Sequence, residues 1–273
     1  MALYLENNYN FLTIIVKKLI ERSLIPKNPV ILDFGCGKCQ LLSNLEKEIP
    51  NSKLYGVDIF RNSKLFKEIN LKKNKFIIKD IKPYEEFNFN QEFDLIIANQ
   101  VFEHIKDLDT IYNFLNSILA KDGKMIVAFP TKEILIEPHL RIPFIHWIKK
   151  YSKFQKLIIF CFNFLKFGNL KKICFKKKEF ENNIDRQIDF CNEKIFYLKN
   201  KDHIYLIKKY FSCFLNLSDT VNYFYRKGST FNNFIRFIIN RIPIKSFRLF
   251  LSSRLIGSIF LIYKNEENEK FKF

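Results

Sequence analysis

A glycine-containing turn after a short apolar run is the first place in this sequence with residues suited to holding a small charged molecule. The apolar run 30–32 is followed by Asp33, and then by Gly35, Cys36 and Gly37. Glycine lets the backbone approach a ligand closely, and a helix that begins after such a turn offers oriented N–H donors. Two glycines alone are weak evidence, because glycine turns are common.

Polar residues follow each of the next three apolar runs, where we expect strands to end. The carboxyl ends of parallel strands meet at one edge of a sheet, so these residues would surround the same crevice as the glycine turn. Asp58 stands about twenty residues after the glycines, where a carboxylate can accept hydrogen bonds from both ribose hydroxyls. The residues predicted to line this crevice are Asp58, Ile59, Asp80, Ile81, Asn99 and Gln100.

Two segments carry histidines that could move a proton. Glu103 and His104 follow the strand expected at 93–98, and His139 follows Glu137 and Pro138. Histidine has an ordinary pKa near 6.5, which suits a general base at neutral pH. His104 and His139 are therefore the candidate catalytic residues. The alternatives are that His104 fixes the start of a helix by hydrogen bonding, and that His139 lies on the surface of a lid.

The elements that would position these residues alternate between strand and helix. Short apolar runs at 30–32, 53–58, 75–79, 93–98 and 124–129 read as strands, with helical patterns between them. This order predicts βαβ units and a parallel sheet. We expect Gly123 to cap the end of the helix after residue 108, and Asp202 to cap a helix at 204–211. A helix at 154–167 and closing strands at 212–217 and 255–263 complete the prediction.

Taken in order, these segments resemble the class I S-adenosylmethionine (SAM)-dependent methyltransferases, in particular the group related to quinone and glycan methyltransferases. The matching segments are 30–37, 56–59, 80–81, 93–105 and 119–130. The resemblance implies an α/β fold with a Rossmann-like, seven-stranded, mostly parallel sheet. Its strand order would be 3-2-1-4-5-7-6, with an antiparallel last strand, helices on both faces and a helical insertion after strand five.

The resemblance also implies SAM as the cofactor and a role for each residue. The glycine turn would admit the methionine end of SAM, Asp58 would bind the ribose, and Asp80 with Ile81 would hold the adenine. Asn99 and Gln100 would line the crevice where the methyl group is transferred.

Three positions distinguish this chain from related patterns. A nicotinamide-binding turn normally has a third glycine where Gln40 stands, and methyltransferases often have one where Cys39 stands. Cys36 and Cys39 form a C-x-x-C spacing, but no second Cys/His pair at zinc spacing accompanies it. In some quinone-pathway relatives a segment similar to that of Glu103 and His104, with an acid at the position of Gln100, binds a divalent metal. We therefore predict no metal site and no redox role.

The predicted organisation has four parts. Residues 1–130 form the SAM-binding core, 131–200 a helical lid that binds the acceptor, and 201–264 the end of the sheet, while 265–273 is a flexible tail. The segment 137–147 resembles a Pro-His…His-Trp stretch in glycan and natural-product methyltransferases. We therefore expect O-methylation of a glycan, a lipid-linked sugar or a small hydroxylated metabolite.

The charge of the chain bears on its partners. Its 273 residues carry a formal net charge of +18, which favours polyanionic partners, although a biased nucleotide composition of the genome would produce the same excess. The helix at 154–167, with its lysines, could lie on an anionic membrane. An RNA methyltransferase is the rival enzyme, disfavoured because no RNA-binding module is recognisable. A catalytically silent membrane- or partner-binding protein is the rival from another class.

The expected compartment follows from two absences. The six cysteines lack the spacing of a disulfide framework, and no signal peptide is recognisable, so we expect a cytoplasmic protein. No apolar run reaches the ~18 residues of a membrane-spanning helix, so any membrane contact would be peripheral, at the inner face. The sequence carries no indication of the oligomeric state.

Overall fold

A computed structural model describes residues 2–59, 77–80, 89, 91–165, 177–219, 241–255 and 257–265. The strands in these ranges are β1 Val30–Phe34, β2 Lys53–Asp58, β3 Ile77–Asp80, β4 Phe93–Asn99, β5 Leu119–Phe129, β6 Cys213–Asn216 and β7 Ser258–Tyr263. The α-helices are α1 Ala2–Glu21, α2 Gln40–Glu48, α4 Leu108–Ile118, α5 Lys153–Phe164, α6 Lys177–Glu193, α7 Asn200–Tyr210 and α10 Lys245–Leu255. Two 3₁₀ turns are η2 Phe102–His104 and η3 Ile145–Trp147.

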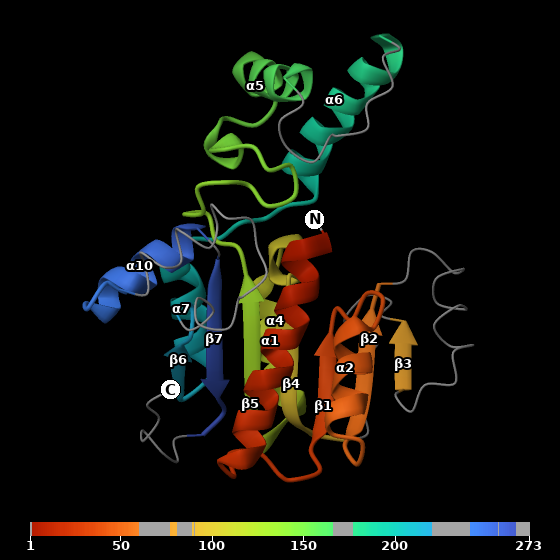
Figure 1. The fold of residues 1–273 in the computed structure, drawn as a ribbon, viewed down its shortest axis with the longest axis vertical. Coiled ribbons are helices and arrows are strands. Elements are labelled where there is room, and N and C mark those ends of the chain that lie inside the picture. Colours follow the sequence, from red (N-terminus) through yellow and green to blue (C-terminus); the bar gives the residue numbers. More distant parts are fainter. Residues whose placement is uncertain are drawn as a thin grey trace.

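The strands form one seven-stranded sheet in the order β3-β2-β1-β4-β5-β7-β6 (Figure 1). Strands β1 to β5 pair in parallel, and β7 is antiparallel to both β5 and β6. The strand order and the antiparallel last strand predicted from the resemblance are confirmed. Because β1 lies between β2 and β4, the carboxyl ends of these three strands meet at one edge of the sheet.

The strands β1, β4, β5 and β7 bury residues on both of their faces, since alternate residues point to opposite sides. In β4, Leu95 and Ile97 pack in the apolar cluster beneath α1 and α2, whereas Ile96 and Ala98 pack in the cluster beneath α4 and α7. The same alternation runs through β5 and β7. The sheet therefore has helices on both faces, as predicted, and this arrangement holds the strand ends in place.

The region around Gly123 differs from the prediction. Helix α4 ends at Ile118, and Gly123 lies inside β5 instead of capping the helix. The pairing of β4 with β5 is irregular here, because Phe93 pairs with Leu119 and Leu95 with Lys124. A Cβ atom at position 123 would stand 2.9 Å from the carbonyl oxygen of Phe93. Glycine is needed for this close backbone approach. From the sequence alone, a glycine with this role looks the same as a glycine that caps a helix.

Other helix and strand boundaries differ from the predicted ones, because packing against neighbouring elements sets them. Helix α7 begins after Lys199, so Asp202 lies in its first turn and is not its cap. Leu255 ends α10, and the last strand starts only at Ser258. The sequence did not resolve α6 or α10 as separate helices. In the part of the chain that the structure describes, no helix is both long and apolar enough to cross a membrane.

Helices α5 and α6 pack against each other beyond the edge of the sheet where β5 ends (Figure 1). Their shared face is apolar at residues such as Ile159 and Ile184, but it also buries two amide pairs. Gln155 and Asn192 exchange two hydrogen bonds, each of 3.1 Å. Asn163 and Gln187 do the same at 3.2 and 3.3 Å. Buried amides need specific partners, so these pairs fix the register of the two helices.

We expect the Asn163–Gln187 pair to behave as a unit in stability measurements. Replacing Asn163 with Leu leaves a buried amide on Gln187 with fewer partners, which should lower the free energy of unfolding by about 1–3 kcal/mol. The double variant Asn163→Leu/Gln187→Leu removes both amides and should recover most of that loss. Urea unfolding of both single variants and the double variant measures the coupling. Additive losses would contradict the pairing.

Candidate functional site

The glycine turn between β1 and α2 is held by the end of β2. The backbone N–H groups of Gly35 and Cys36 donate to the carbonyl oxygen of Val57 at 2.7 and 3.0 Å. The N–H of Gly37 donates to Oδ2 of Asp58 at 2.6 Å. Gly35 has φ +82°, and a Cβ there would lie 2.2 Å from a methyl carbon of Val101. Glycine is thus required at position 35, and the turn, Asp58 and the end of β4 form one unit.

Cys39 ends this turn in a left-handed conformation with φ 58°. That conformation is costly for a residue with a side chain, which explains why glycine is common at this position of the pattern. The thiol of Cys39 is buried and lies 3.6 Å from the sulfur of Cys36. Both thiols are free and pack in the core. The hydrogen bond with Cys39 is the largest cause of the raised pKa of Cys36, and burial is the second.

Two acidic side chains, Asp33 and Asp58, lie beside the turn. Asp33 is almost fully buried, and burial, with a smaller contribution from the charge of Asp58, raises the pKa of Asp33 to about 8. The charge of Asp58 thus disfavours the ionised form of Asp33. A positively charged ligand bound beside the turn would favour the ionised form of both carboxyl groups.

The other predicted crevice residues reach the same edge to different extents. Asn99 ends β4 and is buried, and Gln100 follows it with φ 58° and donates its N–H to the carbonyl of Ala128. Ile59 is 46% exposed directly after Asp58. The backbone of Asp80 pairs with Asp58 at the end of β3. The side chain of Asp80 and all of Ile81 lie outside the described residues.

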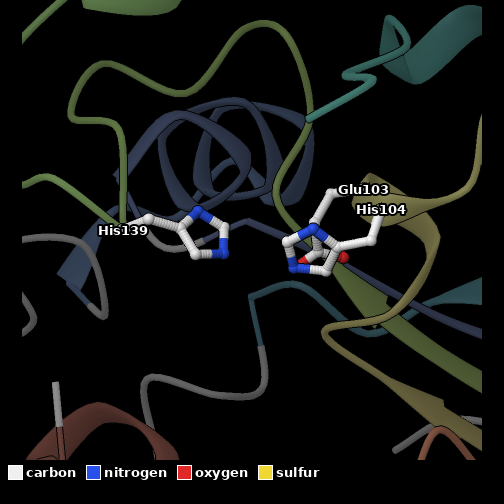
Figure 2. Close-up of side chains that lie close together, drawn as sticks. All are labelled: Glu103, His104 and His139. Atoms are coloured by element: carbon white, nitrogen blue, oxygen red, sulfur yellow. The ribbon is translucent and has the colours of Figure 1, made fainter. Parts of the chain in front are cut away.

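A second group of side chains lies where η2 meets the segment after β5. Glu103, His104 and His139 each offer a ligand atom within 4.8 Å of the others. Figure 2 shows the two imidazole rings facing each other, with the carboxylate of Glu103 beside the His104 ring. The ring centroids are 5.1 Å apart. Both candidate bases of the sequence prediction thus belong to one cluster, which the spacing along the chain did not indicate.

Each histidine of this cluster is oriented by an acceptor behind it. Nδ1 of His104 lies 2.9 Å from the carbonyl oxygen of Lys194, and Nδ1 of His139 lies 2.7 Å from Oε1 of Glu137. A carbonyl or carboxylate oxygen can only accept, so each Nδ1 carries a hydrogen. In the neutral rings, Nε2 then carries the lone pair.

Glu137 is the residue of this region that the sequence prediction left without a role. It is fully buried, and it accepts hydrogen bonds from the hydroxyl of Tyr197 at 2.8 Å and from the N–H of Leu140. Burial alone would raise the pKa of Glu137, but its hydrogen bonds and the charge of His139 lower it. Burial by itself would lower the pKa of His139, but the hydrogen bond to Glu137 outweighs it and raises the pKa above the ordinary value.

Glu103 is the least satisfied group in the cluster. It is 2% exposed, and neither carboxylate oxygen has a hydrogen-bond partner among the residues that the structure describes. Burial raises the pKa of Glu103 to about 7. A buried carboxylate without partners is costly, so its position demands an explanation.

The remaining histidines lie apart from this cluster. Nε2 of His146 is 3.2 Å from the carbonyl oxygen of Lys132, and burial lowers the pKa of His146. His203 is buried against the ring of Phe129, with centroids 3.9 Å apart, and burial lowers its pKa to about 3. His203 therefore packs in the core.

The pairing of Glu137 with His139 makes a measurable prediction. In a Glu137→Gln variant the carboxylate charge is lost while burial persists, so the pKa of His139 should fall. Titration of the histidine ring signals by NMR measures this change. Glu133→Gln is the matched control, because Glu133 instead accepts from the backbone of Asn200 and should leave His139 unchanged. An unaltered His139 pKa in Glu137→Gln would contradict the assigned pair.

Comparisons with known proteins agree with this geometry. A malonyl-[acyl-carrier protein] O-methyltransferase of Ilyobacter polytropus is 35% identical over 107 residues, which are 37% of each chain. A ubiquinone biosynthesis O-methyltransferase of Pelagibacter ubique is 29% identical over 109 residues, covering 40% of this chain and 45% of the relative. The matches thus span less than half the length of these curated relatives.

Solved structures share the fold. The plantazolicin methyltransferase BpumL, solved with a triazolic desmethylPZN analog and SAH, superposes with a TM-score of 0.52 at 15% identity, over 96% of this chain and 85% of that one. The sequence pattern of the family described as "Methyltransferase domain" matches residues 4–174, more than half of the chain. The chain therefore belongs to the methyltransferase-domain family, and its resemblance to the class I SAM-dependent methyltransferases is confirmed.

Proposed function

We propose that this protein transfers the methyl group of S-adenosylmethionine to a hydroxyl oxygen of a glycan, a lipid-linked sugar or a small hydroxylated metabolite. One observation carries the proposal: the glycine turn and the histidine cluster lie next to each other. Val101 packs against Gly35, and Glu103 and His104 follow it within three residues. A donor bound at the turn would thus stand beside groups able to take a proton.

The residues at the turn fit the cofactor. S-adenosylmethionine carries its methyl group on a positively charged sulfur, and it also carries an ammonium group. Asp58 supplies negative charge beside the turn, and a bound cation would favour the ionised form of Asp33, whose pKa is raised to about 8. We assign Gly35, Cys36 and Gly37 to the methionine end and Asp58 to the ribose. Asp80, with Ile59 and Ile81 beside it, is proposed to border the adenine.

The chain's own residues would act mainly by orientation. Methyl transfer is an in-line displacement, and holding the reactants in line can contribute roughly 7–11 kcal/mol. A hydroxyl acceptor also benefits from a base, which is worth about 10²–10⁴-fold in rate. His139 or His104 would accept the hydroxyl proton at Nε2, because Glu137 and the carbonyl of Lys194 fix the opposite nitrogen. Asn99 and Gln100 would line the path between donor and acceptor.

Oxygen is the proposed acceptor atom for two reasons. A hydroxyl group must lose its proton when its oxygen is methylated, so the reaction benefits from a nearby proton acceptor. The histidines of the cluster can accept that proton. Two of the relatives reported above are named as O-methyltransferases. The segment 131–200, with α5 and α6, is proposed to cover the acceptor. An RNA acceptor is the rival, and its mark would be binding of RNA that weakens steeply with salt.

The outer face of α5 supports an acceptor that is attached to a lipid. Its buried side carries the amides Gln155 and Asn163, whereas the side toward solvent exposes Phe154, Phe160 and Phe164 by 59%, 42% and 69%. Lysines flank these rings at positions 153 and 156. Exposed aromatic rings beside lysines match the surface of an anionic bilayer. We propose that this face rests on the membrane during methyl transfer.

The ribose assignment is tested by calorimetry with S-adenosylmethionine. Asp58→Ala removes the acceptor of both ribose hydroxyls, and two such bonds correspond to an affinity loss of about 100-fold. Asp94→Ala is the matched control, because Asp94 accepts from the N–H of Val30 at the opposite end of the sheet and should retain affinity. Failure of the unaltered protein to bind S-adenosylmethionine would refute the proposed function and favour a catalytically silent protein.

The membrane assignment is tested by flotation with phosphatidylcholine vesicles that contain or lack phosphatidylglycerol. The protein should float with the anionic vesicles only, and Phe154→Ser/Phe160→Ser/Phe164→Ser should abolish flotation. Tyr205→Ser on α7 is the control, since Tyr205 is 67% exposed but lies on a different helix. Equal flotation of the triple variant would remove α5 from the proposal, and retention on RNA instead would favour the rival acceptor.

A further inference from the structure

We propose that Glu103, His104 and His139 form a binding site for a divalent transition-metal ion at the acceptor end of the crevice. Two imidazoles and one carboxylate are a ligand set that Zn²⁺, Co²⁺ and related ions accept. The sequence alone predicts no metal, because Gln100 is a poor ligand. His139 follows β5 along the chain, whereas Glu103 and His104 precede it, and the fold brings the three together. No spacing in the sequence indicates this.

The geometry of the three side chains fits one ion. Their ligand atoms lie within 4.8 Å of one another, so a small closing movement would place all three at the about 2.0–2.2 Å bond lengths of nitrogen and oxygen ligands. Glu103 is buried, His139 is partly buried and His104 is exposed, and Figure 2 shows the two imidazole rings turned toward each other. The site is thus open toward solvent, where an acceptor would enter.

The atoms behind the ligands are those that metal sites use. A metal-binding histidine usually donates its other N–H to a carboxylate or a backbone carbonyl, which fixes the ring and strengthens the ligand. His139 donates to Glu137 and His104 donates to the carbonyl of Lys194. Glu137 is held in turn by the hydroxyl of Tyr197. Phe190 of α6 lies against the His139 ring, with centroids 5.3 Å apart, and limits its movement.

Glu103 is the independent observation that points to a cation. Its carboxylate is buried and belongs to the cluster, yet in the described part of the chain neither oxygen has a hydrogen-bond partner. Burying a carboxylate without a partner is unfavourable, and coordination of a cation removes that cost. A histidine pair used only as a base would not need a buried acid in this position.

The ligand types select the class of ion. Mg²⁺ and Ca²⁺ prefer oxygen ligands only, and this site offers two nitrogens and one carboxylate. First-row transition ions bind imidazole well, and three protein ligands leave coordination positions open. This role in catalysis rests on the proposed function: an acceptor hydroxyl at an open position would be oriented and made more acidic. Its proton would leave to solvent, so both histidines would serve as ligands whenever the ion is bound.

The test is titration of the metal-free protein with Co²⁺, followed by its visible absorption, without S-adenosylmethionine or acceptor. We expect one equivalent of Co²⁺ to bind, Zn²⁺ to displace it and Mg²⁺ not to compete. Glu137→Gln should weaken binding by about 10–100-fold through the His139 ring. Glu103→Gln and His139→Asn should each weaken it more. His146→Asn is the matched control and should bind Co²⁺ as the unaltered protein does.

The possible results separate this site from the methyl-donor site. Retained affinity for S-adenosylmethionine in Glu103→Gln shows that the variant is folded, and His139→Asn serves if it is not. No Co²⁺ binding by the unaltered protein would overturn the metal site but leave the proposed methyl transfer standing. Binding that survives both Glu103→Gln and His139→Asn would overturn it as well. Co²⁺ binding without affinity for S-adenosylmethionine would support the metal site and refute the proposed function.

Discussion

The parallel pairing of β1 with β2 and β4 fixes the position of every residue in the donor part of the candidate site. Asp33 pairs with Gly56 on one side and with Ile97 on the other, so β2 and β4 end beside the glycine turn. Two N–H groups of that turn donate to the last part of β2, at Val57. The side chain of Asp58 then accepts from Gly37. Backbone geometry, more than any single side chain, thus creates the crevice.

Buried charge is the second constraint, and it is arranged differently at the two ends of the crevice. At the donor end, Asp33 and Asp58 repel each other, and burial raises the pKa of Asp33 to about 8. At the proposed acceptor end, Glu137 is satisfied by His139, Tyr197 and Leu140, whereas Glu103 has no hydrogen-bond partner within the described ranges. Unpaired buried carboxylates are unfavourable for folding and concentrate at functional sites. Both ends therefore suit positively charged ligands.

The sequence predicted the donor end better than the acceptor end, for a physical reason. Strand periodicity and the residues after each strand are local signals, and they predicted the parallel sheet and the meeting of the glycine turn with Asp58. The strand order came from the resemblance to methyltransferases. The cluster of His104 with His139 depends on how the chain returns after β5, which no local pattern encodes. Gly123 shows the same limit, because its role is contact with the carbonyl of Phe93 and not the capping of a helix.

The acceptor end depends on one extended segment between α6 and α7. The carbonyl of Lys194 orients His104, the N–H of Phe196 donates to the carbonyl of Glu103, and the hydroxyl of Tyr197 holds Glu137. A movement of α6 would therefore shift these contacts together. In the proposed reaction, the sheet would position the methyl donor, and the segment 194–198 would position the histidine cluster at which the acceptor oxygen would lie.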